Sequence, residues 1–103
     1  MEPVFAAVAD PTRRALLGRL RANGPLSISE LGADLPMTRQ AVTKHLAVLR
    51  ASGLIRVRRS GREMLHELNA EPLREVDDWL RPYAAAWDER LAALRRHLEE
   101  DDR

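Results

Sequence analysis

The chain has 103 residues, a formal net charge of +1 at pH 7, 45% hydrophobic residues and 32% charged residues. This length fits one small domain, and the few aromatic residues leave a core built mainly of aliphatic side chains. The lack of cysteine excludes disulfides, thiolate metal sites and thiol redox switches. No apolar run is long enough to span a bilayer, and the N-terminus lacks the segments of a signal peptide, so we expect a cytoplasmic protein without membrane contact.

The first helices are predicted from apolar stripes and capping residues. Val4 and Phe5 begin a short stripe that predicts one or two helical turns. Asp10-Pro11 then predicts a stronger helix, because aspartate caps helix N-termini and proline is tolerated in the first turn. Asn23-Gly24-Pro25 ends that helix.

A second pair of helices follows. Ser27 to Glu30 matches a capping box, in which serine and glutamate each accept from a backbone N–H of the first turn. A turn at Pro36-Met37 leads to the next helix, which we expect over about 38–52, because Thr38 is a good N-cap and Gly53 is permissive at a helix end. Two short helices joined by a tight turn predict a helix-turn-helix.

The periodicity then changes from helix to strand. Apolar residues alternate with arginines in the segment 55–58, which is the pattern of a half-buried strand. Ser60-Gly61 supplies a turn before the next alternating run, 64–68, so we expect a two-stranded hairpin over about 54–68. The fold class is therefore mainly α with a small β-hairpin.

Charge is concentrated in the same part of the chain. Residues 36–66 contain seven basic residues and one acidic residue and carry +6, which leaves −5 for the rest. A polyanion responds to the field within about one Debye length, roughly 8 to 10 Å, so the local charge favours nucleic-acid binding despite the near-neutral total.

The last helix, expected over about 71–98, carries more apolar surface than a small domain needs. Its apolar stripe steps by three or four residues through Leu73, Val76, Leu80, Tyr83, Trp87, Leu91, Leu94 and Leu98. Pro82 either kinks the helix or divides it, and we expect a kinked helix whose second part pairs with its symmetry mate. The residues expected at the dimer interface are Val4, Phe5, Trp79, Tyr83, Trp87, Leu91 and Leu94; the alternative places both tryptophans in the intramolecular core.

One stretch is specific enough to compare with a family. ThrArgGlnAlaValThrLysHisLeuAlaValLeuArgAlaSerGlyLeuIle, followed by ArgArgSerGlyArg, resembles the recognition helix and wing of the ArsR family of bacterial winged helix-turn-helix repressors. The likeness extends upstream through AspProThrArgArgAlaLeuLeu. It implies a single winged helix-turn-helix domain over 1–103 that dimerises through its terminal helices, binds double-stranded DNA and represses transcription, often of its own operon.

In such a domain the first turns of the recognition helix meet base edges in the major groove. The candidates for base contacts are Arg39, Gln40 and Thr43, because these side chains suit guanine, adenine and the thymine methyl group. The candidates for backbone contacts are Thr38, Lys44, His45, Arg58, Arg59 and Arg62. His45 has an alternative role at the edge of the packed face, and Arg13 and Arg14 either contact phosphate or remain solvated.

Many family members release DNA on binding a metal ion. The stretch 30–34 corresponds to a cysteine site of the family and offers no thiolate. His97 and Glu100 have the spacing of half of another site, but Ala84 and Ala86 stand where its first pair belongs. We therefore expect no metal site and no cofactor, and the aromatic residues of the last helix resemble the metal-independent autorepressor branch. The inducer stays unknown, and a hydrophobic ligand or a metal at the dimer helices is the alternative.

Other function classes fit the sequence less well. An enzyme is not expected, because the three histidines lie on different elements and no Gly-rich phosphate loop occurs. A winged-helix protein-interaction module stays open as an alternative, although the basic helix argues against it. RNA binding is disfavoured, since no aromatic stacking residues lie in the basic region.

Overall fold

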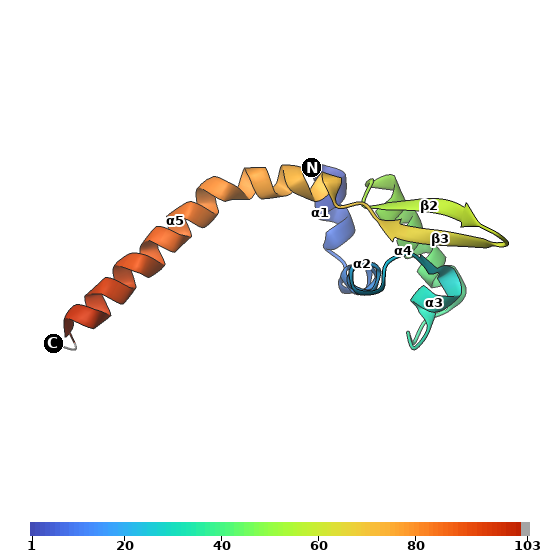
Figure 1. Cartoon of the computed structure of the whole chain (residues 1–103), viewed down its shortest axis with the longest axis horizontal. Helices are drawn as coiled ribbons and strands as arrows, with labels where there is room; N and C mark the ends of the chain where they lie inside the picture. The colour runs from blue at the N-terminus through green and yellow to red at the C-terminus, as the bar shows by residue number, and fades with distance from the viewer. Residues whose placement is uncertain (102–103) are drawn as a thin grey trace.

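The computed structural model describes residues 1–101, and of Asp101 only the backbone; residues 102 and 103, which belong to the expected domain, lie outside the described residues. The elements follow the order α1 (Glu2–Val8), α2 (Pro11–Asn23), β1 (Leu26–Ser27), α3 (Ile28–Gly32), α4 (Arg39–Ala51), β2 (Ile55–Ser60), β3 (Glu63–Leu68) and α5 (Glu71–Asp101). Figure 1 shows the first seven elements packed together and α5 extending away from them. The predicted class, mainly α with a small β-structure, is confirmed.

Three helices begin at the predicted caps. The side chains of Asp10 and Thr38 accept from the backbone N–H three residues further on, at 3.0 and 3.1 Å. Ser27 and Glu30 form the complete capping box. The backbone N–H of Arg13 holds the pKa of Asp10 below its ordinary value, and the backbone N–H of Ser27 does the same for the pKa of Glu30. These caps fix where the helices of the helix-turn-helix start.

The sheet has three antiparallel strands in the order β1-β3-β2, rather than the predicted two. The additional strand β1 pairs with β3 so that Leu26 lies opposite His66. The sequence does not predict β1, because a strand of two residues is too short to show an alternation of apolar and polar side chains. The hairpin turn lies one residue later than expected, because Ser60 pairs with Glu63 and Gly61 occupies the left-handed region at φ +61.

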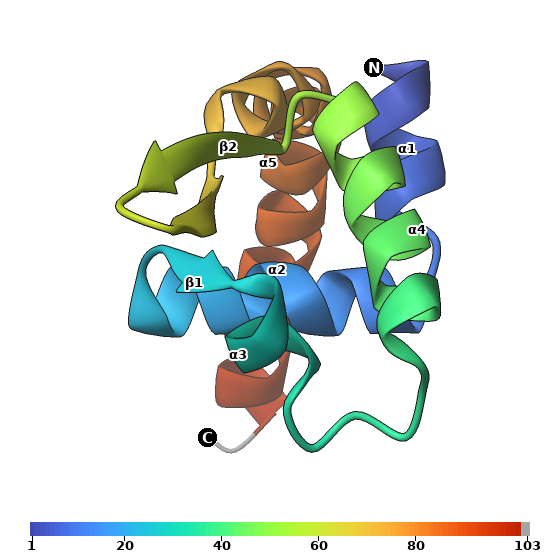
Figure 2. The ribbon, with the colours of Figure 1, turned by 90° about the vertical axis from the view of Figure 1, so that its right-hand side faces the viewer.

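The core is shared by α1, α2, α3, α4 and the start of β2. Its buried side chains are Val4, Ala7, Leu16, Leu20, Leu31, Val42, Leu46, Leu49, Leu54 and Ile55. Viewed along the molecule, α1 and α4 lie beside each other and the strands lie across from them (Figure 2). Val4, which the sequence predicts at a dimer interface, is 5% exposed in the single chain and belongs to the core with Ala7.

Helix α5 takes little part in this core. Among its described residues, Val76 is half-buried against the core, whereas most of its other apolar side chains are exposed. The helix continues through Pro82 as one element, so the kinked rather than the divided helix is observed, and Figure 1 shows its bent course. It gives the molecule extents of 66 × 27 × 22 Å. Within residues 1–101, none of the helices combines the length and apolar character that crossing a membrane requires.

Candidate nucleic-acid interface

Helix α4 has one packed face and one exposed polar face. Val42, Leu46 and Leu49 are buried and fix the helix on the domain. The predicted base-contacting residues Arg39, Gln40 and Thr43 are exposed together near its N-terminus, with Lys44 beside them. A rigid helix anchored by its buried face thus presents hydrogen-bond donors and two cations in its first two turns.

Most of these donors are not used within the chain. In the described part of the chain, the side chains of Arg39, Gln40 and Lys44 make no hydrogen bond or ion pair. The hydroxyl of Thr43 donates to the Arg39 carbonyl at 2.9 Å, which leaves its methyl group for an apolar contact. The hydroxyl of Thr38 serves as the N-cap of α4, so any phosphate contact by Thr38 has to share that oxygen.

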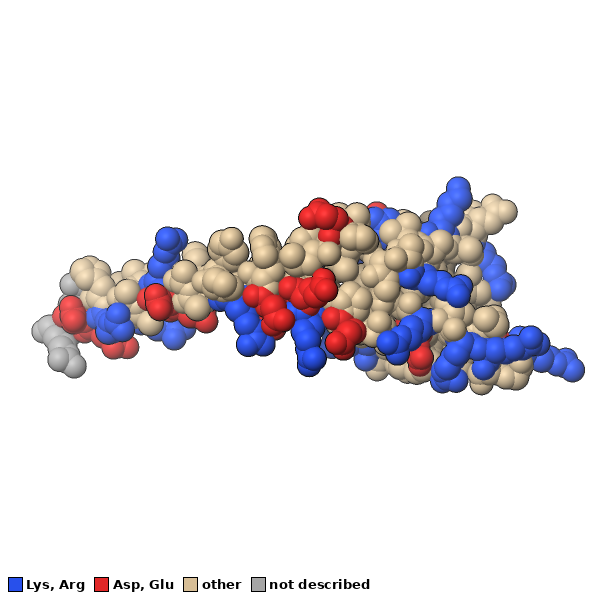
Figure 3. All heavy atoms as spheres, turned by 90° about the horizontal axis from the view of Figure 1, so that it is seen from above, with Lys and Arg blue, Asp and Glu red and all other residues tan. Residues whose placement is uncertain are grey.

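The hairpin β2–β3 carries the second group of cations. Arg58 lies close to the acidic side chain of Glu67 on the paired strand, with 3.4 Å between the guanidinium and the carboxylate. Arg59 donates to the carbonyl of Gly61 at 3.2 Å, and Arg62 lies in the turn. Figure 3 shows lysine and arginine atoms gathered at this end of the molecule. Arg59 and Arg62 therefore carry positive charge at the tip of the hairpin without an acidic partner among the described residues, whereas the charge of Arg58 is partly balanced by Glu67.

A groove separates α4 from the hairpin. Its walls include Thr43 and Arg50 from α4 and Met64 and His66 from β3. Among the described residues, the buried Nδ1 of His66 has no hydrogen-bond partner. Burial lowers the pKa of His66 below its ordinary value of 6.5, the Leu26 backbone opposes this shift, and the charge of Arg50 adds to it. Burial of the ring between α4 and the hairpin thus disfavours the protonated form of His66.

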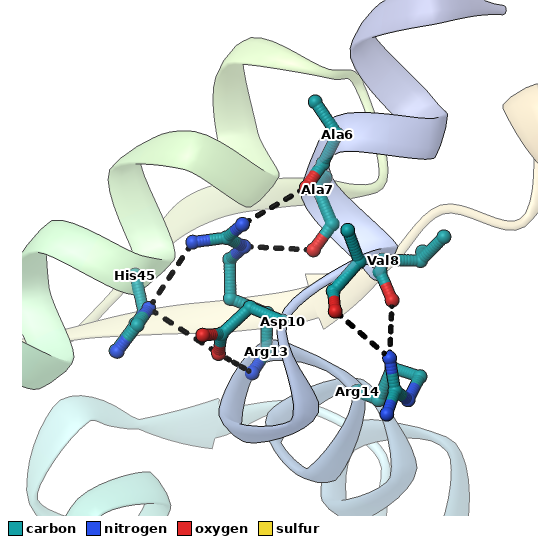
Figure 4. Close-up of polar contacts among 8 residues, drawn as sticks. Ala6, Ala7, Val8, Asp10, Arg13, Arg14 and His45 are labelled. Carbon is teal, nitrogen blue, oxygen red and sulfur yellow. Dashed lines mark hydrogen bonds and ion pairs between the residues drawn. The ribbon is translucent and has the colours of Figure 1, made fainter.

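Arg13 and Arg14 have a role that neither prediction anticipated. Both side chains turn back and donate to carbonyl groups at the end of α1 (Figure 4). Arg13 donates to Ala7 at 2.7 Å and Arg14 donates to Val8 at 2.7 Å. Helix C-terminal carbonyls lack partners within their own helix, so the two arginines are neither simply solvated nor free to take phosphate as their main partner.

His45 lies at the edge of the packed face, and its ring faces the start of α2. Its Nδ1 is 3.5 Å from Nη1 of Arg13 and 3.9 Å from Oδ2 of Asp10. The side chain is 23% exposed, so part of the ring still reaches the surface. The alternative role at the packed edge and the predicted backbone contact are therefore compatible for this residue.

A further arginine of α2 has a role that the sequence patterns do not predict. Arg19 donates to the carbonyls of Leu31 and Ala33 at 2.9 and 2.6 Å, and so closes the C-terminus of α3. The sequence contains one indication of this role. Helix α2 carries several arginines, whereas the short helices α1 and α3 have no basic residue in their last turns to interact with their own C-terminal carbonyls. Long-range pairing of this type does not follow from local spacing.

The aromatic residues of α5 form the predicted surface for self-association. Phe5 of α1 packs edge-on against Trp79, with ring centroids 5.8 Å apart, and Trp79 packs against Tyr83 at 5.4 Å. Trp79, Tyr83 and Trp87 are still 47%, 63% and 59% exposed. Leu91 and Leu94 continue this exposed stripe. Trp79 therefore has an intramolecular contact on one side and an open face on the other.

Metal-ligating side chains are dispersed. Among residues 1–101, no three histidine, cysteine, aspartate or glutamate residues lie together where they could hold a metal ion. His97 and Glu100 both lie on the last turns of α5.

Comparisons with known proteins agree with this arrangement. A helix-turn-helix domain model matches residues 8–58. The chain is 46% identical to the HTH-type transcriptional regulator Rv2034 of Mycobacterium tuberculosis over 63% of this chain and 60% of that protein. It is 28% identical to the transcriptional repressor SdpR of Bacillus subtilis over 78% of this chain and 88% of that protein. The crystal structure of an ArsR family transcriptional regulator, RHA00566, is similar with a TM-score of 0.73 and 39% identity, covering 84% of this chain and 89% of that chain.

Proposed function

Since the chain belongs to the ArsR family of DNA-binding winged helix-turn-helix transcriptional regulators, we propose that it is a sequence-specific repressor, acting as a homodimer in the cytoplasm. Its site is an imperfect palindrome, and its own promoter is among its targets. Occupying that promoter blocks polymerase. The naming of SdpR as a transcriptional repressor supports this direction of control.

The observation that carries the proposal is the position of two basic elements at one end of the molecule. Arg39, Gln40 and Lys44 project from an anchored helix without partners in the described residues, and the arginine-bearing hairpin lies against that helix. A helix enters the major groove, and the hairpin then reaches phosphates or the adjacent minor groove, where arginine is attracted by narrow A·T-rich segments. Helix residues select bases, whereas hairpin residues mainly supply affinity.

Dimerisation is supported by the exposed stripe of α5. An apolar row of this length is uncommon on a monomer, and large aromatic side chains such as Trp87 are typical interface anchors. A two-fold dimer presents two α4 helices, so the half-sites lie about one helical turn, roughly 34 Å, or a multiple of that distance apart.

A direct binding experiment tests the proposal. Fluorescence anisotropy is measured with a labelled fragment from upstream of the protein's own coding sequence and with scrambled DNA, over a salt series, with and without a chelator. Tight binding that depends on sequence and is insensitive to the chelator supports a metal-independent autorepressor. Equal binding to both fragments, or no binding to either, contradicts autorepression and favours a protein-interaction module. A change in affinity on adding the chelator contradicts metal-independent control.

A second candidate adds a small hydrophobic ligand as the releasing signal. It is favoured by the exposed faces of Trp79 and Tyr83 next to Phe5, because such aromatic surfaces bind apolar molecules. Quenching of tryptophan fluorescence by an apolar probe, in parallel with DNA release, distinguishes this form of control from a repressor without an inducer.

A further inference from the structure

The imidazole of His45 has two distinct sides. Its Nδ1 faces the start of α2, where Arg13 Nη1 lies at 3.5 Å and Asp10 Oδ2 at 3.9 Å. Figure 4 shows the other ring nitrogen directed away from both of these residues. His45 belongs to the same helix as Arg39 and Lys44, at the edge where flanking residues meet the backbone rather than the bases.

The guanidinium of Arg13 is held in place by α1. Its Nε donates to the carbonyl of Ala7 at 2.7 Å and its Nη2 to the carbonyl of Ala6 at 2.9 Å. These two bonds fix the plane of the group and leave Nη1 for His45. The position of Arg13 next to the ring is therefore set by the C-terminus of α1.

This contact selects one form of the neutral ring. Guanidinium nitrogens only donate hydrogen bonds, so the Nδ1 of His45 has to act as the acceptor. A neutral imidazole carries one hydrogen, which is then on Nε2. Asp10 does not compete for Nδ1 as a hydrogen-bond acceptor, because 3.9 Å is too long and its Oδ2 already accepts from the backbone N–H of Arg13 at 3.0 Å.

We propose that Arg13 is a positioning residue for DNA binding: it holds Nδ1 of His45 as an acceptor, so that the outward Nε2–H donates to a backbone phosphate oxygen. The inference rests on the proposed function, since it requires DNA at the α4 face. It explains how His45 contributes a donor without carrying a charge. It also makes the end of α1, which packs against Trp79 through Phe5, part of the support of the DNA-binding helix.

Arg14 supplies a matched control. It also donates to carbonyls at the end of α1, at Val8 and Ala9, but it has no contact with His45 in the described residues. Arg13→Gln and Arg14→Gln remove the same charge and similar support of α1. We expect Arg13→Gln to weaken binding to operator and scrambled DNA alike by about tenfold, corresponding to one net hydrogen bond in each protomer. Arg14→Gln leaves both affinities within about twofold of the wild type.

Two substitutions of His45 test the other end of the contact and do not depend on how Arg13→Gln folds. His45→Gln places an amide N–H near the position of Nε2, so we expect it to retain affinity for DNA. The asparagine side chain is shorter by one methylene group, so the amide of His45→Asn does not reach that position and DNA binding weakens about tenfold. The salt slope of log affinity stays unchanged in His45→Asn, because a neutral donor releases no counterion. A slope reduced by about 0.9 for each protomer would instead mean that His45 binds as a cation and would overturn the inference.

The tautomer is measured directly by 15N chemical shifts of the His45 ring at about pH 8, where an ordinary imidazole is neutral. We expect the Nε2–H form in the wild type and in Arg14→Gln, and a mixture of forms in Arg13→Gln. A wild-type ring in the Nδ1–H form, or equal losses of DNA affinity in Arg13→Gln and Arg14→Gln, overturns the inference alone. A wild-type protein that binds no DNA overturns the proposed function and this inference together.

Discussion

The compact part of the molecule buries its apolar side chains, whereas the last helix exposes most of its own. All ten buried core residues lie between Val4 and Ile55. Helix α5 instead has eight large apolar side chains that are at least 37% exposed, against three in the rest of the described chain. A helix gains most of its stability from packing its apolar face against other elements. The compact part provides this packing within the chain, whereas α5 has little of it in the single chain. Residues 1–70 bury their apolar side chains against one another, whereas α5 leaves most of its apolar side chains exposed, as the proposed homodimer would require.

The two regions also differ in charge. Residues 36–66 carry +6, whereas residues 71–101 contain nine acidic and five basic side chains and carry −4. Electrostatic attraction to DNA is therefore confined to one end of the molecule, and the acidic helix is repelled by the same polyanion. The proposed surfaces for DNA binding and self-association are separated along the 66 Å length, and substitutions in one region should change one property first.

The largest effect is expected from a charge in the apolar stripe of α5. Trp87→Glu removes an exposed aromatic side chain and places a carboxylate in the proposed dimer interface. An anchor of this kind contributes about 2 kcal/mol or more, and it occurs twice in a two-fold dimer, so the dissociation constant rises about a thousandfold or more. Analytical ultracentrifugation measures the dimer, and anisotropy measures the resulting loss of operator binding.

Ala85→Glu is the matched control for this substitution. Ala85 is exposed and lies on the opposite side of α5 from Trp87, because two residues turn an α-helix by about 200°. It adds the same charge without touching the stripe and should leave the dimer intact. A monomeric Ala85→Glu protein, or a dimeric Trp87→Glu protein, would mean that α5 associates through a different face.

The next largest effect concerns base selection by α4. Arg39→Ala removes a donor that is suited to guanine and has no partner in the described residues. We expect a loss of about 1 to 3 kcal/mol at each half-site, with relaxed preference at one base position. Competition with a set of single-base operator variants measures the preference. Equal losses on operator and random DNA would contradict the assignment of Arg39 to a base.

A smaller and sequence-independent effect is expected from the wing. Arg59→Ala should weaken binding to all DNA sequences similarly and reduce the salt slope by about one for each phosphate that Arg59 neutralises in the wild type. Arg21→Ala is the control, because Arg21 is an exposed residue of α2 whose side chain makes no hydrogen bond or ion pair in the described residues. If both substitutions change the slope equally, the hairpin acts only through its net charge.

Local signals in the sequence predicted much of the fold, because caps and periodicity act over a few residues. Asp10, Ser27 and Thr38 marked helix starts through hydrogen bonds to backbone groups three residues away. The strand β1 was missed because its two residues are ordered by pairing with β3, which follows almost forty residues later. Pairing at that distance leaves no period in so short a segment.

The candidate site shows the same division between local and distant information. The exposure of Arg39 and Gln40 followed from the helical period of α4. The uses of Arg13 and Arg19 did not, because each guanidinium meets carbonyl groups of a neighbouring helix. Val4 and Phe5 show the same limit: the apolar stripe of α1 has a buried side and a side toward α5, and the sequence does not distinguish them.

The smallest effect expected is on the pH dependence of stability, at the boundary between the wing and α4. His66 has its pKa lowered, mainly by burial, so the folded state binds its proton less readily than the unfolded state. Stability is therefore fully present above the ordinary value of 6.5 and declines as the pH falls below it. The pKa values of Asp10 and Glu30 are lowered from 3.8 and 4.5, so their contribution is lost at lower pH.

Urea denaturation between about pH 7 and pH 5 isolates the histidine contribution, since the capping carboxylates stay ionised in that range. His66→Leu should reduce the decline of unfolding free energy with falling pH, whatever its effect on stability at pH 7. If the unfolding free energy of His66→Leu declined with falling pH as steeply as that of the wild type, the folded protein would accept a proton on His66 without loss of stability. The groove between Arg50 and Met64 would then admit water to the ring, and the wing would not depend on a neutral His66 for its packing against α4.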